Sequence, residues 1–123
     1  MAGETAVTKV TTPWDGTSVQ MFKWTGLTAN SCGVRLCVAP WADKSVHCCG
    51  TFGGAVTIRG SNLLDPNENN ANHWFPLFDP SSTAISFSAN GGKAILEHTY
   101  WVSPLAAAAV AAVDVNLFIG AGR

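Results

Sequence analysis

The feature that most constrains the fold is the alternation of apolar and polar residues with a period of two. Residues 54–60 run Gly-Ala-Val-Thr-Ile-Arg-Gly, in which valine and isoleucine alternate with threonine and arginine. Successive side chains of a β-strand point to opposite faces, so this pattern predicts a strand with one buried face. The same alternation recurs in residues 113–119. A chain built from such segments is expected to fold as sheets packed over one core.

Turn signals divide the rest of the chain into short segments. A polar run at residues 61–72, rich in asparagine, predicts a long loop, and Asp79-Pro-Ser-Ser predicts a tight turn. Asn90-Gly-Gly predicts a hairpin turn. The strand after this turn is expected to end at Pro104. The expected strands are residues 18–25, 34–39, 46–52, 54–60, 84–88, 93–102 and 113–119.

These segments predict a single-domain, all-β protein, an antiparallel β-sandwich or jelly-roll of about seven to eight strands. Residues 14–123 are assigned to the sandwich. Residues 1–13 are interpreted as an extended N-terminal arm or edge strand, because Pro13 has no amide hydrogen to donate, with a partly disordered terminus as the alternative. The alanine-rich residues 105–112 are expected to be a loop or strand extension, because so short a helix is marginal alone.

The composition indicates a surface that is covered by other proteins. Apolar residues make up 47% of the 123 residues, but charged residues only 12%, about half the usual share. A free monomer usually carries more charge, so a homo-oligomer or a docked protein is favoured over a monomer with a serine, threonine and asparagine surface. The net charge is −1 and the basic residues are scattered, which argues against a nucleic-acid partner.

Neither a membrane span nor a signal peptide is expected. No apolar run reaches the about 18 residues that a spanning helix needs. The first residues, Met-Ala-Gly-Glu-Thr-Ala-Val, lack the basic and apolar regions of a secretory signal. Assembly in a cytoplasm is therefore expected.

The four cysteines, Cys32, Cys37, Cys48 and Cys49, are expected to be buried free thiols. Zinc sites usually pair their ligands as Cys-x2–4-Cys, and adjacent cysteines in a strand point to opposite faces, so the spacing argues against zinc. A disulfide is the other alternative, but thiols in a cytoplasm stay reduced by default.

No set of residues predicts catalysis. The histidines His47, His73 and His98 fall in three different predicted elements, and the sequence has no nucleophile elbow, zinc-protease or phosphate-loop motif. The acidic residues Asp65, Glu68 and Asp79 offer oxygen ligands for calcium, but without a fixed spacing solvated loops are the favoured interpretation. The chain is therefore predicted not to be an enzyme, and no metal site is expected.

Five tryptophans are many for this length. Trp24 and Trp74 lie beside strong strand patterns and are predicted to fill the core. The others lie in turns or near strand ends, where exposed tryptophans would anchor a protein partner or stack on sugar rings. The predicted partner interface comprises Val7, Val10, Trp14, Trp41, Tyr100 and Trp101.

The central unit of the chain resembles the capsid decoration, or cement, proteins of tailed bacteriophages. The resemblance rests on Val-Thr-Ile-Arg-Gly-Ser-Asn at residues 56–62, a polar gap, Trp74, Leu77-x-Asp79, a turn and Ile85-x-Phe87. The segments 94–97 and 100–104 fit the same pattern, so the resemblance covers roughly residues 54–119. The cysteine-bearing first half and residues 105–112 depart from it, which leaves the oligomer contacts open.

The resemblance implies a non-enzymatic β-sandwich or jelly-roll on the capsid surface of a virion. Such proteins commonly form dimers or trimers that bridge and stabilise neighbouring major capsid protein subunits, and no cofactor is expected. Two other functions are kept as alternatives. One is another virion component, such as a tail or head–tail joining protein. The other is a carbohydrate-binding module, which would need Trp14, Trp41 or Trp101 exposed and coplanar.

Overall fold

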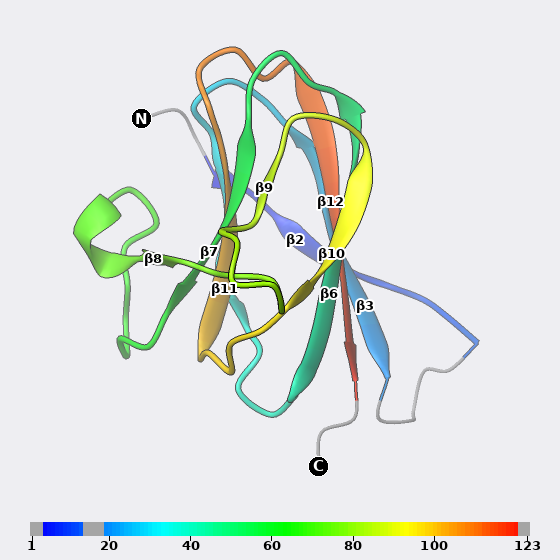
Figure 1. Cartoon of the computed structure of the whole chain (residues 1–123), viewed down its shortest axis with the longest axis vertical. Helices are drawn as coiled ribbons and strands as arrows, with labels where there is room; N and C mark the ends of the chain where they lie inside the picture. Colours follow the sequence, from blue (N-terminus) through cyan, green and yellow to red (C-terminus); the bar gives the residue numbers. More distant parts are fainter. Residues whose placement is uncertain (1–3, 14–18, 121–123) are drawn as a thin grey trace.

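The computed structural model describes residues 4–13 and 19–120, which fold into two stacked sheets (Figure 1). The prediction of an all-β sandwich is confirmed. Within the described residues, the seven-stranded sheet has the order β1-β4-β11-β7-β8, and β5 pairs with β11 and β9 with β7. Its strands are β1 (Glu4–Thr5), β4 (Cys32–Gly33), β5 (Leu36–Cys37), β7 (Val56–Ser61), β8 (Phe75–Pro76), β9 (Ser86–Phe87) and β11 (Trp101–Ala106).

The five-stranded sheet has the order β10-β6-β12-β3-β2 in the described part of the chain. Its strands are β2 (Val7–Val10), β3 (Gln20–Leu27), β6 (Asp43–Thr51), β10 (Gly91–Ile95) and β12 (Ala112–Gly120). Among the strands of the described residues, all pairings are antiparallel except that of β1 with β4. The first residues of the described chain thus contribute one strand to each sheet.

Strand β12 shows how the sequence pattern builds the core. Its odd-numbered residues are buried between the sheets, and its even-numbered residues face outward. Leu117 pairs with Phe22 of β3 on one side and with Val46 of β6 on the other. The buried residues of this strand are Val113, Val115, Leu117 and Ile119. The alternation therefore predicts both the strand and its buried face.

Trp24 lies in the core, as predicted, and is the largest fully buried side chain among the described residues. Its indole Nε1 donates a hydrogen bond to the Val34 carbonyl at 2.8 Å, which satisfies its polar group inside the core. Its ring packs against Gly33, where a Cβ atom would lie 2.5 Å from the Trp24 Cδ1 atom. Glycine at this position lets the two sheets approach the indole ring closely.

A β-bulge bends β3 where it pairs with β12. The register shifts between Val113 and Val115, and Gly26 takes the left-handed φ of 71° that glycine adopts readily. The Gly26 amide donates to Asp114 Oδ1 at 2.8 Å. A regular alternation would place Trp24 and Leu27, which are three residues apart, on opposite faces of the sheet. Because the bulge adds one residue to β3, both side chains lie in the core.

Several local predictions are wrong. Asn90-Gly-Gly does not close a hairpin, because residues 91–95 form β10 in the five-stranded sheet while the preceding β9 pairs with β7 in the other sheet. The predicted strand 93–102 is therefore split into β10 and β11. Pro104 lies inside β11, which continues to Ala106. The predicted strands 34–39 and 84–88 shrink to the two-residue β5 and β9, and residues 105–112 form a strand extension and turn, as expected.

The four cysteines are free thiols, two of them buried and two half-buried. Cys32 and Cys48 are fully buried, and burial raises the pKa of both thiols, that of Cys48 to about 12. The neighbours Cys48 and Cys49 lie on opposite faces of β6, as the spacing predicted. The buried pair therefore holds very little thiolate at neutral pH.

We expect Cys37 and Cys49 to react with Ellman's reagent in the native protein, and Cys32 and Cys48 to react only after unfolding. The thiolate is the reactive species. Burial keeps the thiols of Cys32 and Cys48 protonated and shields them from the reagent. The native reaction should release two equivalents of thionitrobenzoate, and the same protein in urea should release the full set. Equal reaction rates for all thiols in the native protein would contradict the burial described above.

Candidate protein-interaction site

A long excursion from the seven-stranded sheet carries the site. Residues 62–76 leave the end of β7, pass through a short 3₁₀ helix, η1 (Ala71–His73), and return through β8, which pairs back onto β7. Figure 1 shows this segment projecting from the side of the sandwich. The run of turn-forming residues explains why the segment forms no longer strand or helix.

Arg35 ties the excursion to the body of the protein. Its guanidinium donates to Asp65 Oδ1 at 2.6 Å and to the Pro66 carbonyl, and its amide donates to Glu68 Oε2 at 2.8 Å. The guanidinium also lies 4.7 Å from the ring centroid of Trp101. Because one arginine joins three points of the segment and an aromatic ring, the first half of the excursion has a defined position.

The segment is also hydrogen-bonded to β11 and the turn before it. Asn62 Oδ1 accepts from the Tyr100 amide at 2.9 Å, and Trp101 Nε1 donates to the Leu63 carbonyl at 2.9 Å. Within the segment, Trp74 Nε1 donates to the Asn67 carbonyl at 2.9 Å. The predicted loop is thus an ordered structure with its own internal contacts.

Arg59 lies beneath Trp74 of the excursion, and only 7% of its surface is exposed. Its guanidinium donates to Ser103 Oγ at 2.9 Å and stacks on Trp74, 4.6 Å from the ring centroid. Burial lowers the pKa of this guanidinium, while the nearby Cys32 and Glu68 act in the opposite direction. The prediction that Trp74 fills the core is wrong: its ring is half-buried and covers Arg59 on the outer face of the sheet.

The excursion and the turn before β11 present exposed apolar side chains. Leu64 is 83% exposed and Leu63 46%, and the aromatic rings of Phe75 and Tyr100 are each more than a third exposed. We call these four residues the platform. A hollow of about 330 Å³ lies between Leu63 and Phe75, and a second of about 240 Å³ adjoins Tyr100. Exposed apolar groups on an ordered segment, next to concave surface, are typical of a protein-binding site.

The structure distributes the predicted interface residues over several places. Tyr100 belongs to the platform, and Trp101 lies beside it with ring centroids 4.8 Å apart. Val7 and Trp41 pack against the core, whereas Val10 lies on the outer face of the five-stranded sheet. Trp14 lies outside the described residues. The predicted interface did not include Leu63, Leu64 or Phe75. The apolar pair Leu63-Leu64 inside a polar run was a signal that could have identified the two leucines.

The acidic residues considered for calcium have separate protein partners. Asp65 and Glu68 bind Arg35, while Asp79 Oδ1 accepts from Ser81 and Thr83 in the predicted tight turn. The Ser81 hydrogen bond is the main cause that lowers the pKa of Asp79. Within residues 4–13 and 19–120, no group of three or more histidine, cysteine or acidic side chains is placed to hold a metal ion. The same residues contain no helix long and apolar enough to cross a membrane.

Fold and site together define a small two-sheet β-sandwich with an apolar platform on a fixed excursion. Among solved structures, the chain is similar to YomS, a protein derived from the SPBc2 prophage, with a TM-score of 0.58 and 12% identity over 85% of this chain and 96% of that one. It is also similar to a cupin domain from Bordetella pertussis Tohama I, with a TM-score of 0.51 and 11% identity over 96% and 97% of the two chains. No protein-family model and no curated protein matches the sequence. At these identities the likeness establishes the fold alone.

Proposed function

We propose that the protein is a non-enzymatic structural protein of a bacteriophage virion, which decorates the outside of the capsid and bridges neighbouring major capsid subunits. The observation that carries this proposal is the platform, whose residues Leu63 and Leu64 lie on a segment that hydrogen bonds from Arg35 and Trp101 hold in place. The likeness in fold to a prophage-derived protein, the low charge and the resemblance in sequence to decoration proteins support the same assignment.

The proposed mechanism is stabilisation by binding. Leu63, Leu64, Phe75 and Tyr100 would be buried against capsid subunits whose arrangement exists only in the expanded shell. A protein that binds one state and not another stabilises that state by about 2.7 kcal/mol when its concentration is 100 times its Kd. A sandwich with a fixed binding segment suits this role, because little conformational entropy is lost on docking.

A sugar-binding function receives less support from the described tryptophans. Such a site needs open indole faces, but Arg35 covers one face of Trp101 and Arg59 covers one face of Trp74. Trp24 is fully buried. Among the other described tryptophans, Trp41 packs against the core. The platform instead offers the mixed aliphatic and aromatic surface that protein partners bury.

The proposal is tested with heads of the phage whose genome encodes this chain, prepared without the protein. We expect purified protein to co-sediment with expanded heads and to raise their unfolding temperature. Leu64→Asp should weaken binding roughly 30-fold, equivalent to about 2 kcal/mol, because it places an unpaired charge in the buried contact. Leu96→Asp is the matched control, since Leu96 is 56% exposed and lies outside the platform.

Two results would count against the proposal. If the protein binds tails or connectors but not heads, it is another virion component. If Leu64→Asp and Leu96→Asp bind heads equally well, the platform is not the contact surface. Circular dichroism of both variants establishes that they are folded before the binding is compared.

A further inference from the structure

The outer face of the five-stranded sheet is a second, separate surface with an apolar centre. Residues on this sheet alternate between the core and the outside, so outward side chains form rows across the strands. Phe118 of β12 is 41% exposed. By strand register its row contains no charged side chain and runs Val10, Met21, Phe118, Ser45 and Ala94. We call the surface around this row the Phe118 face.

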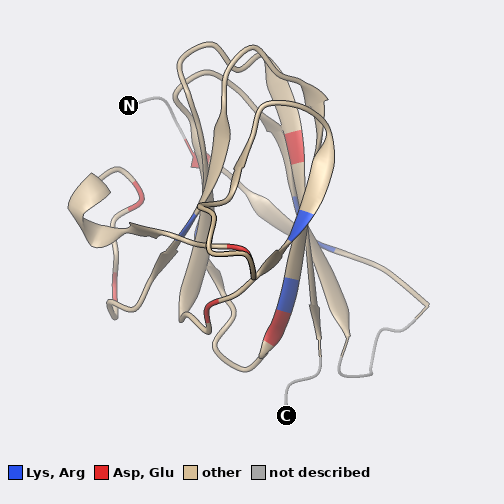
Figure 2. Cartoon of the chain, in the orientation of Figure 1, with Lys and Arg blue, Asp and Glu red and all other residues tan. Residues whose placement is uncertain are grey.

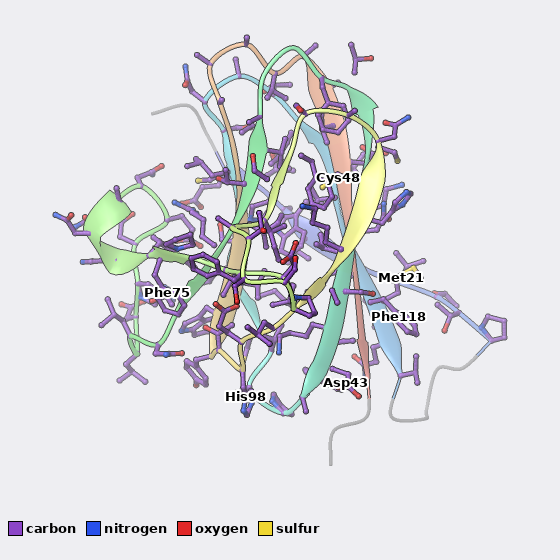
Figure 3. The ribbon with its side chains drawn as sticks, viewed as in Figure 1. Met21, Asp43, Cys48, Phe75, His98 and Phe118 are labelled. Atoms are coloured by element: carbon purple, nitrogen blue, oxygen red, sulfur yellow. The ribbon has the colours of Figure 1, made fainter. Side chains whose placement is uncertain are left out.

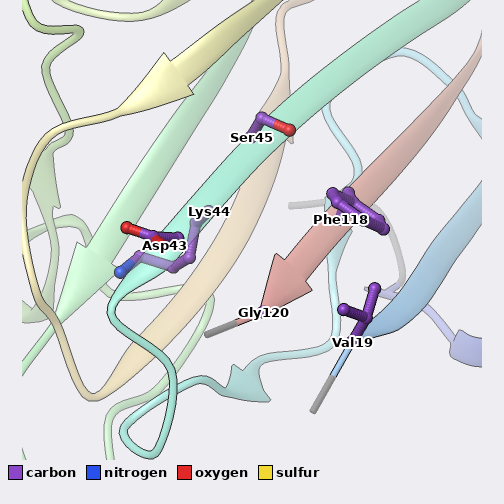
Figure 4. Close-up of a pocket in the computed structure, with 6 residues that line it drawn as sticks. All are labelled: Val19, Asp43, Lys44, Ser45, Phe118 and Gly120. Atoms are coloured by element: carbon purple, nitrogen blue, oxygen red, sulfur yellow. The ribbon is translucent and has the colours of Figure 1, made fainter. Parts of the chain in front are cut away.

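Phe118 stands between two hollows of the Phe118 face. One, of about 340 Å³, lies toward Val19 and Gly120 (Figure 4), and the other, of about 390 Å³, lies toward Met21 and His47. Phe118 and Ser45 line both hollows and form the ridge between them. Because a cavity of about 150 Å³ accommodates a benzene ring, each hollow has room for a phenyl side chain.

One cation and two anions, Lys23, Asp114 and Asp43, lie near this row on the outer face. Lys23 Nζ lies 3.5 Å from Asp114 Oδ2, and each side chain is about one-third exposed. Asp43 lies at the margin, beside the first hollow. Figure 2 shows charged residues on several strands of this sheet, but by register the side chains of Lys9, Lys44 and Lys93 lie in core-facing rows. By register, Lys23 is the one lysine in the outward rows of the described strands, and a single outward lysine offers little attraction to nucleic acid or to an anionic membrane, both of which need several cations.

We infer that the Phe118 face binds a second copy of this chain about a two-fold axis. Such a contact needs a surface that is complementary to itself. The Phe118 face has this property, because it carries a projecting ring beside hollows that fit a ring, and a cation beside an anion. In the pair, each Phe118 enters the hollow beside the other copy's Met21, where sulfur–aromatic contact adds to the burial. Each Lys23 then faces the other copy's Asp114.

This inference goes beyond the proposed function and does not depend on it. Figure 3 shows Phe75 of the platform and Phe118 on opposite sides of the sandwich. Pairing through the Phe118 face therefore leaves both platforms free and directed away from each other. A dimer of this form can hold two partner subunits at once, whatever the partner is.

The test is the native mass of the purified protein, measured by light scattering after size exclusion and by native mass spectrometry. We expect the mass of two chains for the wild type and of one chain for Phe118→Asp, since the change places an unpaired charge at the centre of the contact. Phe118→Leu should remain dimeric because it keeps an apolar side chain there. Leu64→Asp should also remain dimeric, which separates this face from the platform.

A cross-linking measurement tests the contact in the protein without a change at Phe118. Cys49 lines the second hollow, so a short bis-maleimide should join Cys49 to Cys49 of the second copy in a Cys37→Ser background. The product should disappear when Cys49→Ser is added. A monomeric wild type, a dimeric Phe118→Asp, or a dimer that gives no Cys49 cross-link would each overturn the inference. Loss of head binding with an intact dimer would instead count against the proposed function alone.

Discussion

Replacement of Trp24 by alanine is expected to lower the free energy of unfolding by about 3–5 kcal/mol. The indole is fully buried, fills the space above Gly33 and has its only polar atom bonded to the Val34 carbonyl. Alanine would leave a cavity between the two sheets that the neighbouring backbone cannot close. Urea unfolding followed by far-ultraviolet circular dichroism measures the change.

Trp24→Phe is the matched control for that experiment. It keeps an aromatic ring in the core but removes the Nε1–H donor, which leaves the Val34 carbonyl without this partner. We expect it to cost about 1–3 kcal/mol, clearly less than alanine. Equal and small losses for both variants would show that the indole is not the centre of the core.

Replacement of Arg59 by leucine is expected to lower the free energy of unfolding by about 1.5–3 kcal/mol and to release the excursion. The guanidinium donates a hydrogen bond to Ser103 and stacks on the ring of Trp74. Its loss therefore removes a contact between the sheet and residues 62–76. Limited proteolysis should then cut within residues 62–76 faster than in the wild type. Urea unfolding gives the accompanying change in stability.

Arg59→Lys separates the effect of charge from that of shape. A lysine keeps the positive charge but lacks the planar fork that bonds Ser103 and stacks on an indole ring. We therefore expect it to resemble leucine in the proteolysis experiment. A lysine variant as resistant to protease as the wild type would show that charge alone holds the segment, and would contradict the role given to the stacking.

The period-two alternation was sufficient for the central strands. It identified β7 and β12 and their buried faces. On a sheet with one buried face, apolar residues mark the positions that point into the core and polar residues mark those that point outward. Trp24 followed from the same pattern. The turn at residues 79–82 followed from local chemistry, since the Asp79 side chain bonds its own neighbours in the way that favours aspartate in turns.

The same pattern does not predict which strands pair with each other. Alternation tells which face of a strand is dry but not which strand lies beside it. Glycines at residues 91–92 therefore looked like a hairpin, whereas the chain crosses there from one sheet to the other. The prediction for Trp74 failed for a related reason. Residues 62–76 cover part of the outer face of the seven-stranded sheet, so a large apolar side chain near a strand can be buried either in the core or beneath this segment.

The sequence by itself determined the all-β class, the main strands and the scarcity of charge, because each depends on local polarity and propensity. Only the tertiary structure decided how residues 62–76 fold back over Arg59, which apolar side chains remain exposed on them, and that Met21 and Phe118 meet on one outer face. These features arise from contacts between residues far apart in the chain, and the energy of such contacts leaves no repeating signal in the order of amino acids.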